Sequence, residues 1–439
     1  MLDKKTAEQV IKNVTSQTQN YAQVRIHGSA QGTTRFAKSE ISQNVAITDT
    51  SVALTVFNGK KEATASTNVL TEAGLAQLAK DADALLAHVP EGEFEAFPFS
   101  QEAVPERANG GALAQSFGTA GRAALIKEGM GHVKDGYTAS GALVLDQKTV
   151  ALGDSKGAFR FAAFDEVSFN TVVTHADGAD GAGECISYTS APDIIAQFKK
   201  AQATAEAARN PVPAQLGAHT VVLSPLAFGD LLTFMAYVLN AKAVDDGFSF
   251  AAGKLGQKVF GENLTIRDDV SHPELQPLFF DMESNPRQAL PLIEKGIVKN
   301  LLYDNKRAAK HGVKPTGHCA QMWGGMGAIP LNVLVEAGTS SLADIIASTP
   351  KGIFVNEFHY TNFVNPRNLQ ITGLTRNGAF LIEDGKLGAP ISTVRFTESL
   401  LDAFCHITAI SSEREKVSGL GIGLIPAVRI ENFHFTSKA

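Results

Sequence analysis

"SPLAFGDLLTFMAYVLN", residues 224–240, has the pattern of a helix that packs against a hydrophobic core. Ser224 is a favourable N-cap, and Pro225 suits the first turn of a helix. Apolar side chains then recur on one helical face: Phe228, Leu231, Leu232, Met235, Val238 and Leu239. The sequence therefore predicts a buried helix over residues 224–240, and the middle of this helix holds no side chain suited to catalysis.

The composition indicates a soluble, well-packed globular protein. The chain has 439 residues, of which 44% are hydrophobic and 19% charged, and this length suggests two domains. A net charge of -6 argues against a general nucleic-acid binder, which usually carries a basic face. Cys185, Cys319 and Cys405 lie far apart without a CxxC spacing, so neither a disulfide framework nor a thiolate metal site is expected.

The sequence contains neither the pattern of a signal peptide nor that of a membrane helix. The opening "MLDKKTAEQVIKNVTSQ" is charged and amphipathic, and it lacks the apolar run of a signal peptide. No stretch approaches the roughly 18 consecutive apolar residues that a membrane helix needs. We therefore expect a cytoplasmic protein that does not contact a membrane.

Two regions with different patterns follow each other along the chain. Residues 1–210 alternate between strand-like and helix-like segments, with a hairpin signal at Asn58-Gly59. From the Pro-containing stretch at 211–215 onward, short apolar segments alternate with Gly, Asn-Pro and Asp-Gly turns, which is typical of strands with a few inserted helices. We predict an α+β protein with an N-terminal domain of strands and helices (1–210) and a β-rich C-terminal domain (211–439).

Several segments, taken in order, resemble the TldD/PmbA family, whose members have been labelled modulators of DNA gyrase. In the first domain the resemblance rests on "RFAKSEI", "VFNGKKEATASTN" and "VALGDSKGAF". In the second it rests on "HTVVLSPLAFGDLL", "FGENLTIRDD", "LPLIEKGIVKNLLYDNKRAAKHGVKPTGH" and "GAFLIEDGKLGAPI". The resemblance covers nearly the whole chain, and it rests on the order and spacing of these segments.

The resemblance implies one of two kinds of subunit. TldD-like chains resemble zinc metallopeptidases with an HExxxH helix and a later cysteine ligand, whereas TldE-like (PmbA) chains lack these residues. Aligned on Leu231-Leu232, the family's His, Glu and second His fall on Thr233, Phe234 and Val238. None of these side chains supplies a zinc ligand or a general base. The Gly-rich segment where the family has its cysteine, "SSEREKVSGLGIGLIPAVRI", contains no cysteine.

The resemblance thus predicts a non-catalytic TldE-like subunit without zinc of its own. Such a subunit pairs with a TldD-like metalloprotease subunit in a heterodimer that degrades or matures small unfolded peptides, and zinc is expected only in that partner. When alone, the chain could form a homodimer. The alternatives are a hydrolase with a relocated site at Cys319 and His318 and a peptide-binding module without a catalytic partner.

Other residues are candidates for a relocated site or for a peptide-contacting surface. His318 and Cys319 could form a nucleophilic pair in a hydrolase, although a buried cysteine beside a hydrogen-bonded histidine is the favoured interpretation. Two aromatic- and Met-bearing segments could line a peptide cavity or a subunit interface, with core packing or an edge strand as the ordinary alternative. The residues concerned are Met322, Trp323, Met326, His359, Tyr360 and Asn362.

Overall fold

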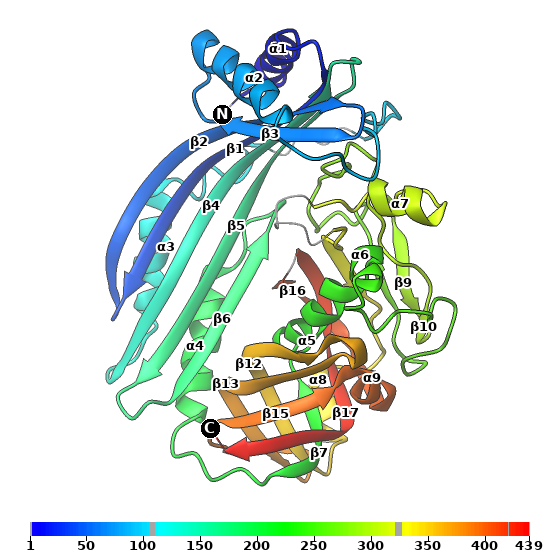
Figure 1. Ribbon diagram of the computed structural model, residues 1–439. Helices are drawn as coiled ribbons and strands as arrows, with labels where there is room; N and C mark the ends of the chain where they lie inside the picture. The colour runs from blue at the N-terminus through cyan, green and yellow to red at the C-terminus, as the bar shows by residue number, and fades with distance from the viewer. Residues whose placement is uncertain (1, 106–109, 321–326, 420, 439) are drawn as a thin grey trace.

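The first domain is built on a long antiparallel sheet. The computed structural model describes residues 2–105, 110–320, 327–419 and 421–438. Within these residues the first sheet has the strand order β3-β2-β1-β4-β5-β6, and it curves along one side of the molecule (Figure 1). Its strands are β1 (Tyr21–Ala37), β2 (Glu40–Asn58), β3 (Lys61–Thr67), β4 (Tyr137–Asp154), β5 (Phe159–His175) and β6 (Asp180–Ser187).

Two pairs of helices pack against this sheet. The first pair, α1 (Lys4–Thr15) and α2 (Glu72–Leu86), shares a hydrophobic core with β1 and β2. The second pair, α3 (Thr119–Met130) and α4 (Ile194–Ala207), covers the strands further along the sheet through a core that includes Phe36, Phe169 and Phe198. The alternation of strands and helices predicted for residues 1–210 and the predicted hairpin at Asn58-Gly59 are confirmed.

The second domain contains a closed ring of five strands. Each strand of the ring pairs with the next in the order β7-β12-β13-β15-β17, and β17 pairs with β7 to close it. Buried aromatic side chains of β12, β15 and β17, namely Phe358, Phe396 and Phe433, contact one another in the core. The ring strands are β7 (Gly217–Leu223), β12 (Lys351–Asn365), β13 (Gln370–Glu383), β15 (Val394–Ser399) and β17 (Ile422–Lys438).

Further strands extend this sheet, and short helices lie between its strands along the chain. Strand β16 pairs with β17, β14 pairs with β13, and β11, β8, β9 and β10 continue the sheet beyond β17. Their bounds are β8 (Ile266–Asp268), β9 (Leu290–Glu294), β10 (Ile297–Val298), β11 (Asn332–Val335), β14 (Lys386–Pro390) and β16 (Ile407–Ser418). The helices are α5 (Pro225–Val238), α6 (Ala241–Asp245), α7 (Asn305–His311), α8 (Leu342–Ala347) and α9 (Leu400–Ala403), with 3-10 turns at Pro366–Asn368 and Phe404–His406.

The two domains share a hydrophobic core where they meet. Phe164 and Tyr188 of the first domain join Leu278, Phe280 and Leu424 of the second in this core. The segment between the end of α4 at Ala207 and the start of β7 at Gly217 connects the two sheets. The α+β class is confirmed. Among the residues that the structure describes, we find no helix that is both long and apolar enough to span a membrane.

Candidate functional site

Helix α5 begins where the sequence predicts it. The Ser224 hydroxyl accepts a hydrogen bond from the Ala227 N–H at 3.1 Å and donates one to the Asn356 carbonyl of β12 at 2.5 Å. Its apolar face is buried in the main core of the second domain. The helix ends at Val238, and Asn240 then caps α6 by accepting from the Ala243 N–H at 2.8 Å. The side-chain NH2 of Asn240 also donates to the Tyr237 carbonyl in the last turn of α5 at 3.0 Å, so side-chain hydrogen bonds fix α5 at both ends.

The three positions aligned with the family's zinc motif are engaged in packing. The Thr233 hydroxyl donates to the Gly229 carbonyl at 3.1 Å, one turn earlier in the helix. The Phe234 ring meets the Phe363 ring of β12 edge-on, with 5.0 Å between centroids, and Val238 is buried. A hydroxyl, a phenyl ring and an isopropyl group do not fit a zinc ion, which takes imidazole, carboxylate or thiolate donors. Over residues 2–105, 110–320, 327–419 and 421–438, no group of three or more His, Cys, Asp or Glu side chains is placed to hold a metal.

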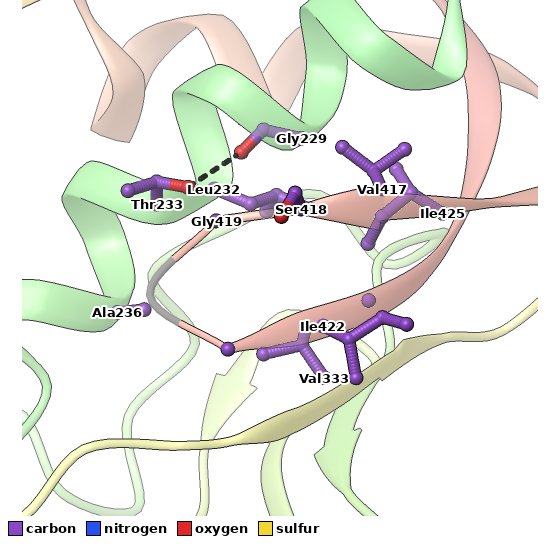
Figure 2. Close-up of a pocket in the computed structure, with 12 residues that line it drawn as sticks. Gly229, Leu232, Thr233, Ala236, Val333, Val417, Ser418, Gly419, Ile422 and Ile425 are labelled. Atoms are coloured by element: carbon purple, nitrogen blue, oxygen red, sulfur yellow. Dashed lines mark hydrogen bonds between the residues drawn. The ribbon is translucent and has the colours of Figure 1, made fainter. Parts of the chain in front are cut away.

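The Gly-rich segment at the end of β16 lies directly against α5 (Figure 2). A small cavity of about 30 Å³ separates the two, lined by Gly229, Leu232, Thr233 and Ala236 on the helix side and by residues of 417–425 on the other. The contact is close: a Cβ on Gly419 would lie 2.7 Å from the Thr233 hydroxyl oxygen. The cavity is large enough for one or two water molecules and too small for a peptide. The two segments aligned with the family's metal ligands therefore lie side by side here, around an apolar gap.

Three carboxylates from different elements lie close enough to one another to interact electrostatically. Asp230 lies on α5, Glu184 on β6 and Glu357 on β12. Burial, together with the repulsion of Glu357 and Glu184, raises the pKa of Asp230 to about 8, although its carboxylate accepts the Phe358 N–H at 3.1 Å. Burial and the repulsion of Glu357 raise the pKa of Glu184 to about 7, and burial raises the pKa of Glu357. This acidic group comes from both domains, and sequence reasoning did not find it because the three residues lie far apart in the chain.

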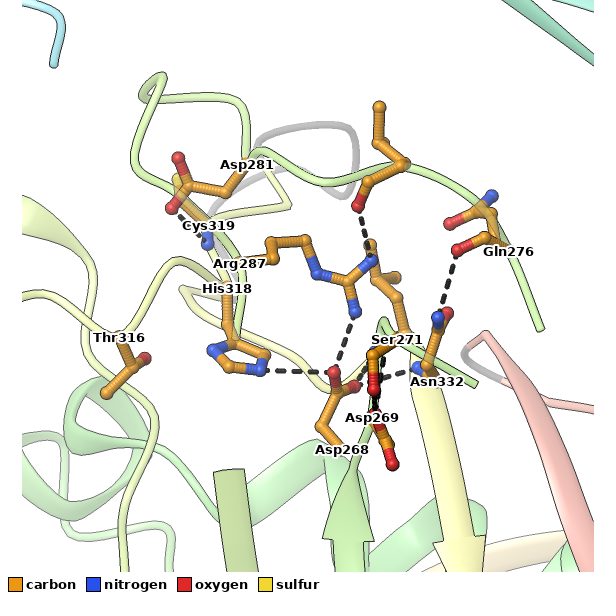
Figure 3. A network of polar contacts seen from close by, with 12 residues as sticks. Asp268, Asp269, Ser271, Gln276, Asp281, Arg287, Thr316, His318, Cys319 and Asn332 are labelled. Carbon is orange, nitrogen blue, oxygen red and sulfur yellow. Dashed lines mark hydrogen bonds and ion pairs between the residues drawn. The ribbon is translucent and has the colours of Figure 1, made fainter. Parts of the chain in front are cut away.

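His318 and Cys319 belong to a buried polar network (Figure 3). The His318 imidazole is fully buried, and its Nε2 lies 3.3 Å from an Asp268 carboxylate oxygen. Asp268 also pairs with Arg287 at 2.8 Å and accepts the backbone N–H groups of Leu331 and Asn332 at 2.7 and 2.8 Å. Burial alone would raise the pKa of Asp268, but Arg287 and His318 together hold it well below its usual value.

Cys319 lies on the other side of this network. Its backbone N–H donates to Asp281 at 3.0 Å, and the residue is 6% exposed. The His318 ring is directed at Asp268, whereas the backbone N–H of Cys319 donates to Asp281 (Figure 3), so the imidazole is placed as a partner of Asp268 rather than as a base for the thiol. The pair has the geometry of structural residues.

The segment at residues 359–362 forms an exposed bulge in β12. The pairing of β12 with β13 is interrupted between His359 and Asn362, and Tyr360 between them adopts a positive φ of 51°. The Tyr360 side chain is 71% exposed, and Asn362 donates to its carbonyl at 3.1 Å. The other candidates of this kind, Met322, Trp323 and Met326, lie outside the described residues. A bulge that presents an aromatic ring to solvent is compatible with a contact surface.

Comparison with known proteins gives these observations a family context. Residues 216–437 match the model of the PmbA/TldA metallopeptidase C-terminal domain, and residues 22–86 match the first domain of the same proteins. The chain belongs to the PmbA/TldD family. Helix α5 lies within the residues that match the C-terminal domain model.

The chain is similar in sequence to a protein named TldD and in fold to one named TldE. An uncharacterized protein of Methanocaldococcus jannaschii is 30% identical over 190 residues, which cover 42% of this chain and 44% of that protein. A metalloprotease TldD homolog of Buchnera aphidicola is 30% identical over 185 residues, covering 40% of this chain and 37% of that protein. These alignments span less than half the length of the curated relatives. TldE from Thermococcus kodakarensis has the same fold, with a TM-score of 0.87 at 18% identity over 98% of this chain and 99% of that one.

Proposed function

We propose that this chain is the non-catalytic, TldE/PmbA-like subunit of a metallopeptidase complex. In this proposal it pairs with a TldD-like subunit that holds the zinc ion, and the complex degrades or matures small unfolded peptides in the cytoplasm. The single observation that carries the proposal is the packing of Thr233, Phe234 and Val238 at the positions aligned with the zinc motif.

The surroundings of α5 support a role in holding peptide. The cavity between α5 and the Gly-rich segment is too small for a substrate, so a substrate of this subunit has to lie elsewhere. The carboxylates of Asp230, Glu184 and Glu357 and the exposed ring of Tyr360 lie on α5, β6 and β12. In the proposal these groups contact the peptide or the partner, while the partner supplies the metal-bound water.

The test compares the chain alone with the chain plus its TldD-like partner. The chain is produced in zinc-supplemented medium, its metal content is measured, and the cleavage of an unstructured peptide is followed with and without a chelator. We expect no stoichiometric zinc and no chelator-sensitive cleavage for the chain alone. With the partner, we expect a stable complex and cleavage faster than that by the partner alone.

A surface variant sharpens this test. Tyr360→Ala removes an exposed ring from the bulge of β12, whereas Leu85→Ala removes a similarly exposed apolar side chain from α2. We expect the first variant to weaken the complex or its cleavage rate and the second to leave both unchanged. One zinc per chain, or chelator-sensitive cleavage by the chain alone, contradicts the proposal.

A further inference from the structure

A second, larger hollow lies away from α5, between the first sheet and α7. It consists of an outer cavity of about 420 Å³ and an inner one of about 80 Å³. Both are lined by Glu62 of β3 and Lys306 of α7, whose side chains form an ion pair at 2.6 Å. In Figure 1 these elements lie in the upper part of the molecule and α5 in the lower part. The ion pair therefore stands where the outer cavity meets the inner one.

The inner cavity contains a buried arginine with spare hydrogen-bond donors. Arg25 of β1 is 7% exposed and lies against the Phe99 ring, 5.2 Å from its centroid. Its Nε donates to the Met282 carbonyl at 2.9 Å, and its terminal nitrogens donate to Thr55 and Gln23 at 3.3 and 3.2 Å. A guanidinium has five N–H groups, so one N–H on each terminal nitrogen is left without an acceptor among the described residues.

The charge of Arg25 also lacks a direct counter-ion. Among the described residues no carboxylate forms an ion pair with it, although Cys319 first, and then Glu283, Asp281 and Glu62, act on it through space. Burial and the neighbouring Asp281 raise the pKa of Glu283 to about 8. Both effects favour the neutral form of Glu283 and so weaken its compensation of the Arg25 charge. An uncompensated buried charge is costly, which favours the entry of an anion.

Two further donors point to the same ligand chemistry. Asn305 lines the inner cavity; its Oδ1 accepts from Asn285 at 3.1 Å, and its side-chain NH2 has no acceptor within the described part of the chain. The Lys306 ammonium uses one of its three N–H groups for Glu62. Arg25, Asn305 and Lys306 thus present unused N–H groups to one space of a size that suits a carboxylate group.

We propose that the inner cavity binds a single carboxylate group, held by the two free N–H groups of Arg25 and by Asn305 and Lys306, with the rest of the ligand in the outer cavity. A fork of two N–H groups is the arrangement with which arginine binds carboxylates. Glu283 and the exposed Glu95 also line the inner cavity, and Glu62 competes for Lys306, so a ligand with many negative charges is disfavoured. A peptide C-terminus and a small free carboxylate share the required chemistry. The inference is independent of whether the chain pairs with a metalloprotease subunit.

Calorimetric titration and thermal unfolding of the full chain test this site. The probes are acetate, inorganic phosphate, a short unstructured peptide with a free C-terminus, and the same peptide with an amidated C-terminus. The site variants are Arg25→Gln and Lys306→Gln. The control is Lys310→Gln, because Lys310 is also on α7 and also in an ion pair, with Asp245 at 2.9 Å, but does not line either cavity.

We expect acetate or the free peptide to bind and to raise the unfolding temperature. We expect Arg25→Gln to weaken this binding about tenfold or more, Lys306→Gln to weaken it less, and Lys310→Gln to leave it unchanged. Binding of the free peptide but not of its amide identifies a peptide C-terminus as the ligand, whereas equal binding of acetate identifies a small carboxylate.

Three results overturn the inference. The first is the absence of binding by both acetate and the free peptide. The second is binding that neither site variant weakens. The third is phosphate binding tighter than that of either carboxylate probe, because this would show a different anion site. If Arg25→Gln does not fold, the comparison of Lys306→Gln with Lys310→Gln decides alone.

Discussion

The buried ion pair between Asp268 and Arg287 allows a quantitative prediction. Both side chains are completely inaccessible to solvent, and the two groups lie 2.8 Å apart. The Asp268 carboxylate also holds the backbone of Leu331 and Asn332, at the start of β11, through two N–H bonds. The change Asp268→Asn removes the negative charge while keeping the shape of the side chain. It leaves the Arg287 guanidinium buried without a counter-charge.

The size of the effect follows from this burial. Removal of one partner of a buried ion pair typically costs about 3–5 kcal/mol of unfolding free energy. Because whole domains are stable by only about 5–15 kcal/mol, the loss is a large fraction of the total. The double change Asp268→Asn with Arg287→Met is expected to cost less than the sum of the two single changes, by about 1–3 kcal/mol, since the second change removes the unpaired charge.

Urea unfolding at pH 7, followed by circular dichroism, measures these differences. Asp246→Asn is the matched control, because Asp246 pairs with Lys242 on the surface and the change should cost no more than about 0.5 kcal/mol. Because the pKa of Asp268 is lowered in the folded protein, its charge contributes fully to the unfolding free energy above the pKa that Asp268 has in the unfolded chain. This contribution is lost as the pH falls towards the lower pKa of Asp268 in the folded protein. A loss below about 1 kcal/mol for Asp268→Asn, or strict additivity in the double variant, refutes the reasoning.

Three further predictions concern single side chains. The pKa of Asp230 is raised to about 8 in the folded protein. Asp230 therefore lowers the unfolding free energy increasingly as the pH rises from about 4 to 8. Asp230→Asn should raise the unfolding free energy at pH 8 and reduce its decline between about pH 4 and 8. Iodoacetamide should label the exposed Cys405 well before the buried Cys319, as read by peptide mass spectrometry. Ser224→Ala should lower the unfolding free energy by about 1–2 kcal/mol, because it removes two hydrogen bonds at the start of α5.

Each of these predictions has a clear contrary result. An unchanged pH profile for Asp230→Asn contradicts the raised pKa, and Asp49→Asn on the exposed part of β2 serves as its control. Labelling of Cys319 as fast as that of Cys405 in the folded protein contradicts its burial and revives the relocated hydrolase site. Stability equal to that of the parent in Ser224→Ala contradicts the role of the cap, and Ser42→Ala on the exposed part of β2 provides the comparison.

Much of the secondary structure could be predicted because local signals were strong. Helix α5 has its cap, its proline and its apolar face within 17 residues of sequence, and the Asp384-Gly385 turn between β13 and β14 is explicit in the sequence. The turn between β1 and β2 was harder to foresee. Lys38 and Ser39 both adopt positive φ there, 51° and 60°, which the sequence does not reveal because neither is a glycine or an asparagine.

The sites depended on contacts that no local pattern records. The sequence shows that α5 has no zinc donors at the aligned positions. That Thr233 of α5 lies close to Gly419 could be learned only from the fold. Arg25 and Lys306 are 281 positions apart in the chain (306 − 25) and meet at one cavity only because the two domains pack together. A buried arginine is unusual for its residue type, so sequence reasoning alone treats Arg25 as a surface residue.

The closed ring of strands in the second domain has a consequence for biosynthesis. Leu223 of β7 pairs with Val428 of β17, 205 positions later (428 − 223). At a translation rate of roughly 5–20 residues per second, β17 is synthesised on the order of ten to forty seconds after β7. During this time an apolar strand edge stays open on the nascent chain, where it can pair with the wrong partner. We therefore expect the first domain to fold while translation continues, and the second domain to depend on chaperones that shield β7 until β17 emerges.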